Sequence, residues 1–146
     1  FIKPNWLKIL IVRDPLDRLI SFYNWFNRKK YKISFNYFLE NITLYKPIRQ
    51  LQYLSFKQKL SNKPLVEKFT TENVKHVFDY IIDVSNIFTI FNIIENIFFS
   101  KKIYWNKYNT TDSGLNRNDL TSKQLDKIFS NNNFLQDIKF YDYVTK

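Results

Sequence analysis

The chain has 146 residues, enough for one domain, and 45% of them are hydrophobic and 19% aromatic, so it can bury a core and is not expected to be disordered. It has no cysteine and one histidine, which excludes a disulfide framework and metal sites built from cysteines or from several histidines. A net charge of +10, from 23 basic and 13 acidic residues, suits a partner with negative charge: a nucleotide, a sulfated glycan, a nucleic acid or an anionic membrane surface.

The first predicted elements are a buried strand and a helix, joined by a charged turn. Residues 7–12 are almost entirely Leu, Ile and Val, and so short an apolar run is typical of a central parallel strand covered on both faces. Asp14 is a suitable N-cap, and Pro15 suits the first helical position because its missing N–H is not needed there. Asp17 adds negative charge to the first turn, which stabilises the helix by interacting with the positive end of its dipole. The helix is therefore expected to begin at Pro15.

When successive residues are placed 100° apart around the helix axis, the helix has an apolar side and an opposite, mostly polar side. The apolar side, which we expect to pack on the sheet, carries Leu16, Leu19, Ile20, Tyr23 and Phe26. The opposite side carries Arg18, Ser21 and Trp25.

The edge where the strand ends is a candidate anion site. Ligands of open parallel sheets bind beyond the carboxyl ends of the strands, where the next helix presents free N–H groups and the positive end of its dipole. Arg13 lies at this edge, and its planar fork of donors could meet the same phosphate as the hydroxyl of Ser21. Taken singly, an Arg-Asp pair before a helix is more often a capping device, and a lone serine a surface residue.

Together these residues form a longer pattern. It resembles the R-D-P-x-x-R-x-x-S-x-Y element of sulfotransferases, particularly the carbohydrate-type branch. The matching residues are Arg13, Asp14, Pro15, Arg18, Ser21 and Tyr23. In that family the element binds the 3'-phosphate of the sulfate donor, 3'-phosphoadenosine 5'-phosphosulfate. The resemblance implies that Arg13 and Ser21 hold this phosphate and that Arg18 supports the site or contacts substrate.

The resemblance also sets expectations for the rest of the fold. It implies an α/β architecture, a P-loop-NTPase-like three-layer parallel sheet with flanking helices, in a single domain that covers residues 1–146. The family's second hallmark, a loop that binds the 5'-phosphosulfate, should lie upstream of the first strand. The chain begins at Phe1 and has no methionine, so we expect the first strand-loop-helix to precede Phe1. No apolar run approaches the roughly 20 residues of a membrane span. A membrane anchor upstream of Phe1 stays an open alternative.

The middle of the chain carries basic and aromatic residues without a specific motif. The strongest positive cluster is Arg28, Lys29, Lys30 and Lys32, which suits either a solvated helix end or an acidic substrate. Ser34 is expected to cap a short helix, residues 35–41. In residues 46–65 aromatics alternate with bases, a pattern found in stacking platforms for single-stranded nucleic acid or sugars and more often in a buried core with lysines outside.

A second α/β unit is predicted in residues 80–99. Residues 80–84 suit a strand, Ser85 a cap, and residues 86–99 an apolar helix, and this unit should join the same sheet. His76 precedes the strand; a general base is one interpretation, but its place between a polar turn and a strand favours a structural or surface histidine. The catalytic base is left unassigned.

The last third contains an irregular segment and two helices. In sulfotransferases a basic loop near residues 101–118 closes over the nucleotide, which makes Lys107, Asn109 and Thr111 weak candidates beside the simpler interpretation of a surface loop. Thr121 and Gln124 form a capping box for a helix through Phe129, and a last helix is expected to begin near Asn133. These helices also look like the end of carbohydrate-type sulfotransferases.

By this resemblance we expect an enzyme, a sulfotransferase that moves a sulfuryl group from 3'-phosphoadenosine 5'-phosphosulfate to a hydroxyl. The carbohydrate-type branch implies that this hydroxyl is on a carbohydrate. No metal is expected to take part. That resemblance implies the Golgi membrane for a eukaryotic protein and the cytoplasm for a bacterial one. The alternative is a basic nucleic-acid-binding module without catalysis, which explains the charge and leaves the phosphate element unexplained. A third candidate function is that of another phosphate-binding protein, such as a nucleotide kinase. It would require an upstream glycine-rich loop with a magnesium-binding Ser or Thr.

Overall fold

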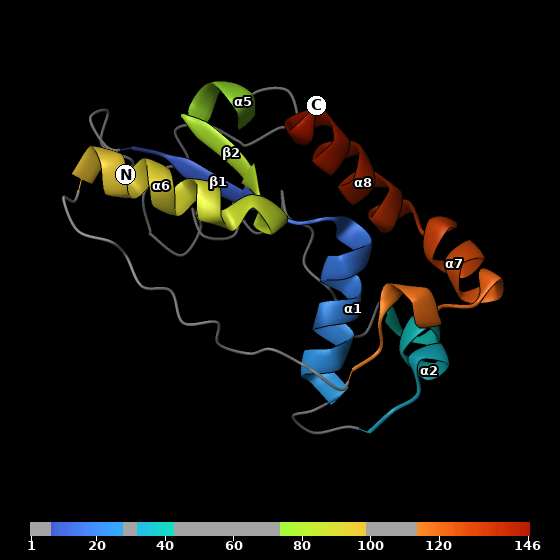
Figure 1. Cartoon of the computed structure of the whole chain (residues 1–146). Coiled ribbons are helices and arrows are strands. Elements are labelled where there is room, and N and C mark those ends of the chain that lie inside the picture. The colour runs from blue at the N-terminus through green and yellow to red at the C-terminus, as the bar shows by residue number, and fades with distance from the viewer. Residues whose placement is uncertain (1–6, 28–31, 43–73, 99–113) are drawn as a thin grey trace, which may run out of the picture.

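The computed structural model describes residues 7–27, 32–42, 74–98 and 114–146 (Figure 1). These residues form two strands, six α-helices and two 3-10 turns. The strands are β1 (Ile9–Val12) and β2 (Tyr80–Asp83), and the 3-10 turns are η2 (Val84–Asn86) and η3 (Arg117–Asp119). The helices are α1 (Pro15–Phe26), α2 (Phe35–Glu40), α5 (Val74–Val77), α6 (Ile87–Phe98), α7 (Ser122–Phe129) and α8 (Asn132–Thr145). Within the described ranges no helix combines the length and the apolar character needed to cross a membrane.

The two predicted strands pair in parallel, as expected. Ile9 lies opposite Tyr80, and Val12 lies opposite Asp83 at the carboxyl end of the pair. Leu10 and Val12 face a core formed with α5 and α8 and are 8% and 1% exposed. The expectation that both faces of β1 are covered is wrong at Ile11, which is 51% exposed. An apolar run indicates that burial of each of its side chains would be favourable. Whether a side chain is buried depends on which other segments of the chain pack against the strand.

The helix after β1 packs differently from the prediction. Four of the five residues predicted on its apolar side are buried as expected and Phe26 is half-buried, but this side joins a second core with α2, α7 and α8 rather than the sheet. This core contains Leu16, Leu19, Ile20, Tyr23, Phe35, Phe38, Leu39, Ile128 and Phe134. Figure 1 shows α1 leaving the end of β1 and running away from the sheet toward α2. Periodicity identifies the apolar side of a helix, whereas the surface that covers it depends on tertiary packing.

Helix α8 belongs to both cores. Its first turn places Phe134 in the core around α1, and its last turns place Phe140 and Val144 in the core under the sheet. Figure 1 shows α8 extending from the region of α5 and β2 down to α7. At its end, the Nζ of Lys75 on α5 lies 4.6 Å from the ring centroid of Tyr143. Among the described elements, α8 is thus the helix that connects α1 to the sheet.

Local capping signals were predicted well. Asp14 caps α1, Ser34 caps α2 by accepting from the N–H of Tyr37, and Thr121 with Gln124 forms the expected capping box of α7. The last helix begins at Asn132, one residue earlier than expected, because Asn131 is its cap. One assignment was wrong: the carboxylate of Asp83, not the hydroxyl of Ser85, caps the turn before α6.

Candidate anion-binding site

The amino-terminal turn of α1 does not present the free N–H groups that we expected. The Oδ1 of Asp14 accepts from the backbone N–H of Leu16 at 2.9 Å and from that of Asp17 at 3.1 Å. The carbonyl of Asp14 accepts from the N–H of Arg18 at 2.9 Å, and Pro15 has no N–H. The first-turn donors are therefore already used, and an anion at this edge would have to be bound by side chains.

Two residues of the sequence pattern have suitable positions for this. Arg13 follows β1 directly at the carboxyl end of the parallel pair, and it is half-buried. Ser21 is also half-buried and lies on the side of α1 opposite the core, four residues before Trp25, which is 45% exposed. Ser21 is six residues along the helix from Pro15, about 9 Å at 1.5 Å per residue. A phosphate that contacts both side chains would therefore lie beside the first two turns of α1.

Arg18 is held inside the protein. Its Nη2 donates to the Oδ2 of Asp137 on α8 at 2.5 Å. The side chain of Asp137 is only 2% exposed and that of Arg18 is 29% exposed, so the contact is a largely buried ion pair. Arg18 therefore ties α1 to α8.

Tyr23, the last fixed position of the pattern, also has a structural contact. Its hydroxyl donates to the carbonyl of Ile33 at 2.8 Å and accepts from the Nδ2 of Asn27 at 3.2 Å. The Oδ1 of Asn27 in turn accepts from the N–H of Ile33 at 2.7 Å. Burial raises the pKa of Tyr23 above its ordinary value, so the hydroxyl stays a donor at neutral pH. This network fixes the end of α1 to the chain that enters α2.

The structure adds an aspartate and a tyrosine that sequence reasoning missed. Asp83 ends β2 beside the end of β1, and its Oδ2 accepts from the hydroxyl of Tyr141 on α8 at 2.6 Å. Its Oδ1 accepts from the N–H of Ser85 at 2.7 Å. Burial raises the pKa of Asp83, but the hydrogen bonds from Ser85 and Tyr141 and the charge of Arg13 together bring it below its usual value of 3.8. Asp83 is thus a charged carboxylate whose environment includes Arg13.

Tyr141 is the other half of this pair. The hydrogen bond to Asp83, burial, and the charges of Asp83, Asp14 and Asp17 raise its pKa to about 12. Its hydroxyl is therefore protonated and donating throughout the physiological range. The contact joins residues 58 positions apart in the chain, so only an acidic residue at the end of a predicted strand could have drawn attention to it.

A third missed residue is Arg117, which reaches the start of α1 from the segment before α7. Its Nη2 lies 3.3 Å from the Oδ1 of Asp14, and its Nη1 lies 3.8 Å from the Oδ1 of Asp17. The segment is held along α1 by Asn24, whose side chain donates to the carbonyl of Leu115 at 2.9 Å and accepts from its N–H at 3.0 Å.

The sole glycine of the chain lies in this segment. A Cβ on Gly114 would lie 2.5 Å from the Nδ2 of Asn24, closer than such atoms can approach. Gly114 is thus a position where the backbone must approach a side chain closely. A glycine at position 114, the sole one in the chain, is the sequence signal that could have indicated the contact between this segment and α1.

The local charge at this edge is mixed. The guanidinium of Arg117 lies beside the carboxylates of Asp14 and Asp17, and the charge of Arg13 acts on the carboxylate of Asp83. Such a site can bind an anion by directed hydrogen bonds from side chains, but it does not have a uniformly positive field. Within the described residues no group of three or more His, Asp or Glu side chains could hold a metal ion.

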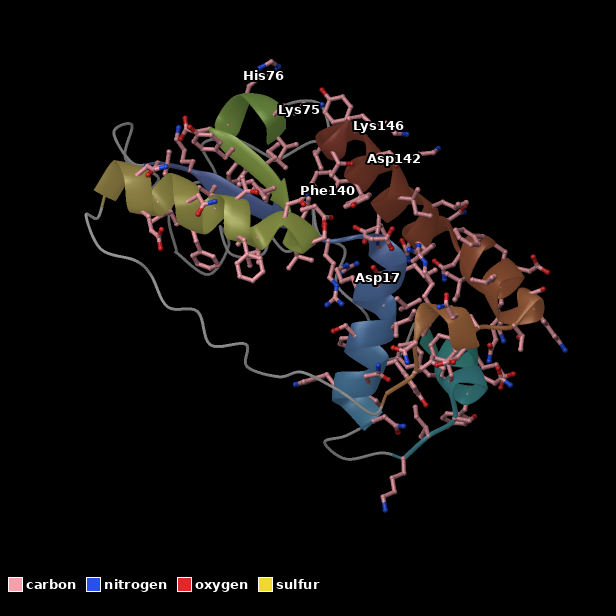
Figure 2. All side chains as sticks on the ribbon, in the orientation of Figure 1. Asp17, Lys75, His76, Phe140, Asp142 and Lys146 are labelled. Carbon is pink, nitrogen blue, oxygen red and sulfur yellow. The ribbon has the colours of Figure 1, made fainter. Side chains whose placement is uncertain are left out.

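His76 lies away from this edge. It is exposed on α5, which precedes β2, whereas Asp83 ends β2 and Arg13 follows β1. Figure 2 shows its side chain pointing outward, on the far side of the sheet from Asp17. The interpretation of His76 as a surface residue is confirmed.

Several predicted residues lie outside the described ranges. They are Arg28, Lys29 and Lys30 of the basic cluster, the aromatic-basic segment 46–65, and Lys107, Asn109 and Thr111. Lys32, the remaining member of the cluster, is described and exposed.

The comparisons with known proteins place the chain in no group: no family model, no curated protein and no solved structure matches it.

Proposed function

We propose that this chain is the donor-binding part of a sulfotransferase, with a P-loop-NTPase-like parallel sheet, and that Arg13 and Ser21 bind the 3'-phosphate of 3'-phosphoadenosine 5'-phosphosulfate. The observation that carries the proposal is the complete R-D-P-x-x-R-x-x-S-x-Y pattern at the junction of a parallel strand and a helix. Arg13 lies at the carboxyl end of the strand, the edge where parallel α/β sheets bind their ligands.

The geometry around the pattern supports a division of roles among its residues. Asp14 caps α1, Arg18 is paired with Asp137, and Tyr23 is bonded to Ile33, so these residues stabilise the element. Arg13 and Ser21 are half-buried and belong to neither apolar core, and by the resemblance they are the residues that bind the 3'-phosphate.

The proposed reaction is an in-line transfer. The hydroxyl oxygen of an acceptor, on a carbohydrate in our proposal, forms a bond to sulfur as the bond between sulfur and the bridging oxygen of the donor breaks. The acceptor proton goes to a base, and 3',5'-adenosine bisphosphate leaves. Arg13 and Ser21 act on binding and orientation of the nucleotide, and such positioning with fixed charges supplies most of the catalysis in related group transfers.

The first experiment is calorimetric titration of the chain with 3',5'-adenosine bisphosphate and with 5'-AMP. We expect the bisphosphate to bind more tightly, and Arg13→Ala to weaken its binding by more than about tenfold, because a charge-assisted contact contributes about 1.5 to 3 kcal/mol. Lys123→Ala is the matched control, since it removes one positive charge from an exposed position on α7. Equal affinity for the two nucleotides in the folded wild-type chain would contradict the proposal.

The net charge of +10 favours one competing function, binding of nucleic acid without catalysis. This function predicts oligonucleotide binding that weakens steeply with salt and that Arg13→Ala and Lys123→Ala reduce equally, since each removes one charge. The sulfotransferase proposal predicts that the two variants differ.

A further inference from the structure

We propose that the carboxylate of Asp83 accepts a hydrogen bond from the 2'-hydroxyl of the bound nucleotide, so that the site selects a ribonucleotide 3'-phosphate over its 2'-deoxy counterpart. The inference rests on the proposed function, in which Arg13 binds the 3'-phosphate. It adds a residue from the second strand of the sheet to a site that the sequence pattern confines to residues 13–23.

The first step is the place of Asp83 in the site. Val12 and Asp83 are register partners at the carboxyl end of the parallel pair, so β1 continues into Arg13 beside Asp83. The charge of Arg13 acts on this carboxylate. The hydroxyl that bonds to it, from Tyr141, is affected by the charge of Asp14 at the start of α1. Asp83 therefore lies at the edge where parallel sheets bind their ligands, close to the first turn of α1.

The second step is the hydrogen-bonding capacity of that carboxylate. Asp83 is half-buried, so part of its surface is open to solvent. Its Oδ2 accepts from the hydroxyl of Tyr141 at 2.6 Å, and Ser85 bonds to it through its N–H and its side chain. An ionised carboxylate has about four acceptor positions on its two oxygens, so these bonds leave capacity for a further donor. Burial raises the pKa of Asp83, but the hydrogen bonds and the charge of Arg13 lower it overall, so the group is ionised at neutral pH.

The third step is the kind of ligand that these two charged groups recognise together. An ionised Asp83 can only accept hydrogen bonds, whereas Arg13 can only donate them. A carboxylate beside a bound phosphate is unfavourable unless the ligand also brings it a donor, because the two negative charges repel each other. In a ribonucleotide 3'-phosphate the 2'-hydroxyl is such a donor, on the carbon next to the one that carries the phosphate. The guanidinium of Arg13 has several N–H donors, so it can contact the phosphate and protein acceptors at the same time.

The fourth step is the fixed orientation of the carboxylate. Tyr141 belongs to α8, where its neighbour Phe140 is 2% exposed in the core under the sheet. Asp83 itself caps η2 by accepting from Ser85. Contacts from α8 and η2 therefore hold the carboxylate in place before a ligand binds, and a fixed acceptor discriminates between ligands at a lower entropic cost.

The test is calorimetric titration of the chain with 3',5'-adenosine bisphosphate and with its 2'-deoxy analogue. We expect the wild-type chain to bind the ribonucleotide about five- to tenfold more tightly, because a hydrogen bond to a charged group is lost with the 2'-hydroxyl. Asp83→Asn should reduce this ratio to about twofold or less, since a neutral amide is the weaker acceptor. The variant should bind the 2'-deoxy analogue at least as tightly as the wild type does, because a negative charge near the phosphate is gone. A purely structural role of Asp83 would instead weaken the binding of both nucleotides alike.

Two further variants complete the test. Asp79→Asn is the matched control, since Asp79 is exposed at the other end of β2, where its Oδ2 accepts from the N–H of Lys8 at 2.7 Å. It removes the same charge and should leave the ratio unchanged. Asp83→Ser keeps an oxygen that can cap the turn after β2 but removes the charge and the reach of the carboxylate, so it should lower the ratio as Asp83→Asn does.

The outcomes separate this inference from the proposed function. A ratio that is high in the wild type and in Asp79→Asn, and low in both Asp83 variants, supports the inference. Equal affinity of the wild-type chain for the two bisphosphates, or a ratio that Asp83→Asn and Asp83→Ser leave unchanged, refutes the role of Asp83. The proposed function then stands if 3',5'-adenosine bisphosphate still binds more tightly than 5'-AMP. A wild-type chain without that preference refutes both.

Discussion

Replacing Arg18 by methionine should destabilise the protein strongly, because it leaves the carboxylate of Asp137 buried without its guanidinium. The carboxylate is 2% exposed and the two groups are 2.5 Å apart. Removing one partner of a buried ion pair typically costs about 3 to 5 kcal/mol. Since the side chain of Arg18 is itself 29% exposed, water screens the pair, and we expect a loss near the lower end, about 3 kcal/mol.

Urea denaturation followed by circular dichroism measures this loss. With a slope of about 2 kcal/mol per molar urea, typical of a small domain, the midpoint of Arg18→Met should fall by about 1.5 M. The double variant Arg18→Met/Asp137→Leu should recover much of the loss, because an apolar pair of similar volume replaces the buried charges.

The control for Arg18→Met is a substitution in an exposed ion pair, which also joins a basic and an acidic side chain. Lys127 on α7 lies 3.6 Å from Glu40, with side chains 46% and 61% exposed. Lys127→Met should change the free energy of unfolding by less than about 1 kcal/mol. The reasoning is refuted if Arg18→Met is no more destabilising than Lys127→Met, or if the double variant is less stable than Arg18→Met.

Two further substitutions test other contacts. Gly114→Ala should lower the thermal midpoint, because its Cβ would lie 2.5 Å from the Nδ2 of Asn24 and displace the amide that bonds Leu115; the loss should be about 1 to 3 kcal/mol and should shrink in the Asn24→Ala background. Tyr141→Phe should reduce the alkaline sensitivity of the fold, measured by urea denaturation across pH. The pKa of Tyr141 is raised from 10.0 to about 12, so its contribution is complete below pH 10 and is lost as pH rises through 12, a difference of about 1 to 2 kcal/mol after screening by solvent. A variant that unfolds with the same pH dependence as the wild type between pH 10 and 12 would contradict this assignment.

Elements that depend on neighbouring residues were predictable. The strand β1, the start of α1 at Pro15, the cap at Ser34 and the capping box at Thr121 all follow from residues within a few positions of one another. The sequence pattern that nominates Arg13 and Ser21 is local in the same sense. These predictions succeed because backbone N–H groups at a helix start must find an acceptor nearby, and few residue types provide one.

The sequence alone thus determined where most of the described elements begin and which side of α1 is apolar, and it is the source of the proposal that Arg13 and Ser21 bind a phosphate. Tertiary structure alone decided what covers that side, and it brought Asp137 to Arg18 across 119 positions and Tyr141 to Asp83 across 58. The physical reason is that a helix or strand shows its need for burial in its own residue spacing, whereas a long-range ion pair or hydrogen bond leaves no periodic trace in either segment. The environment of the candidate site, where the charges of Arg13 and Asp83 act on each other, is therefore a property of the fold.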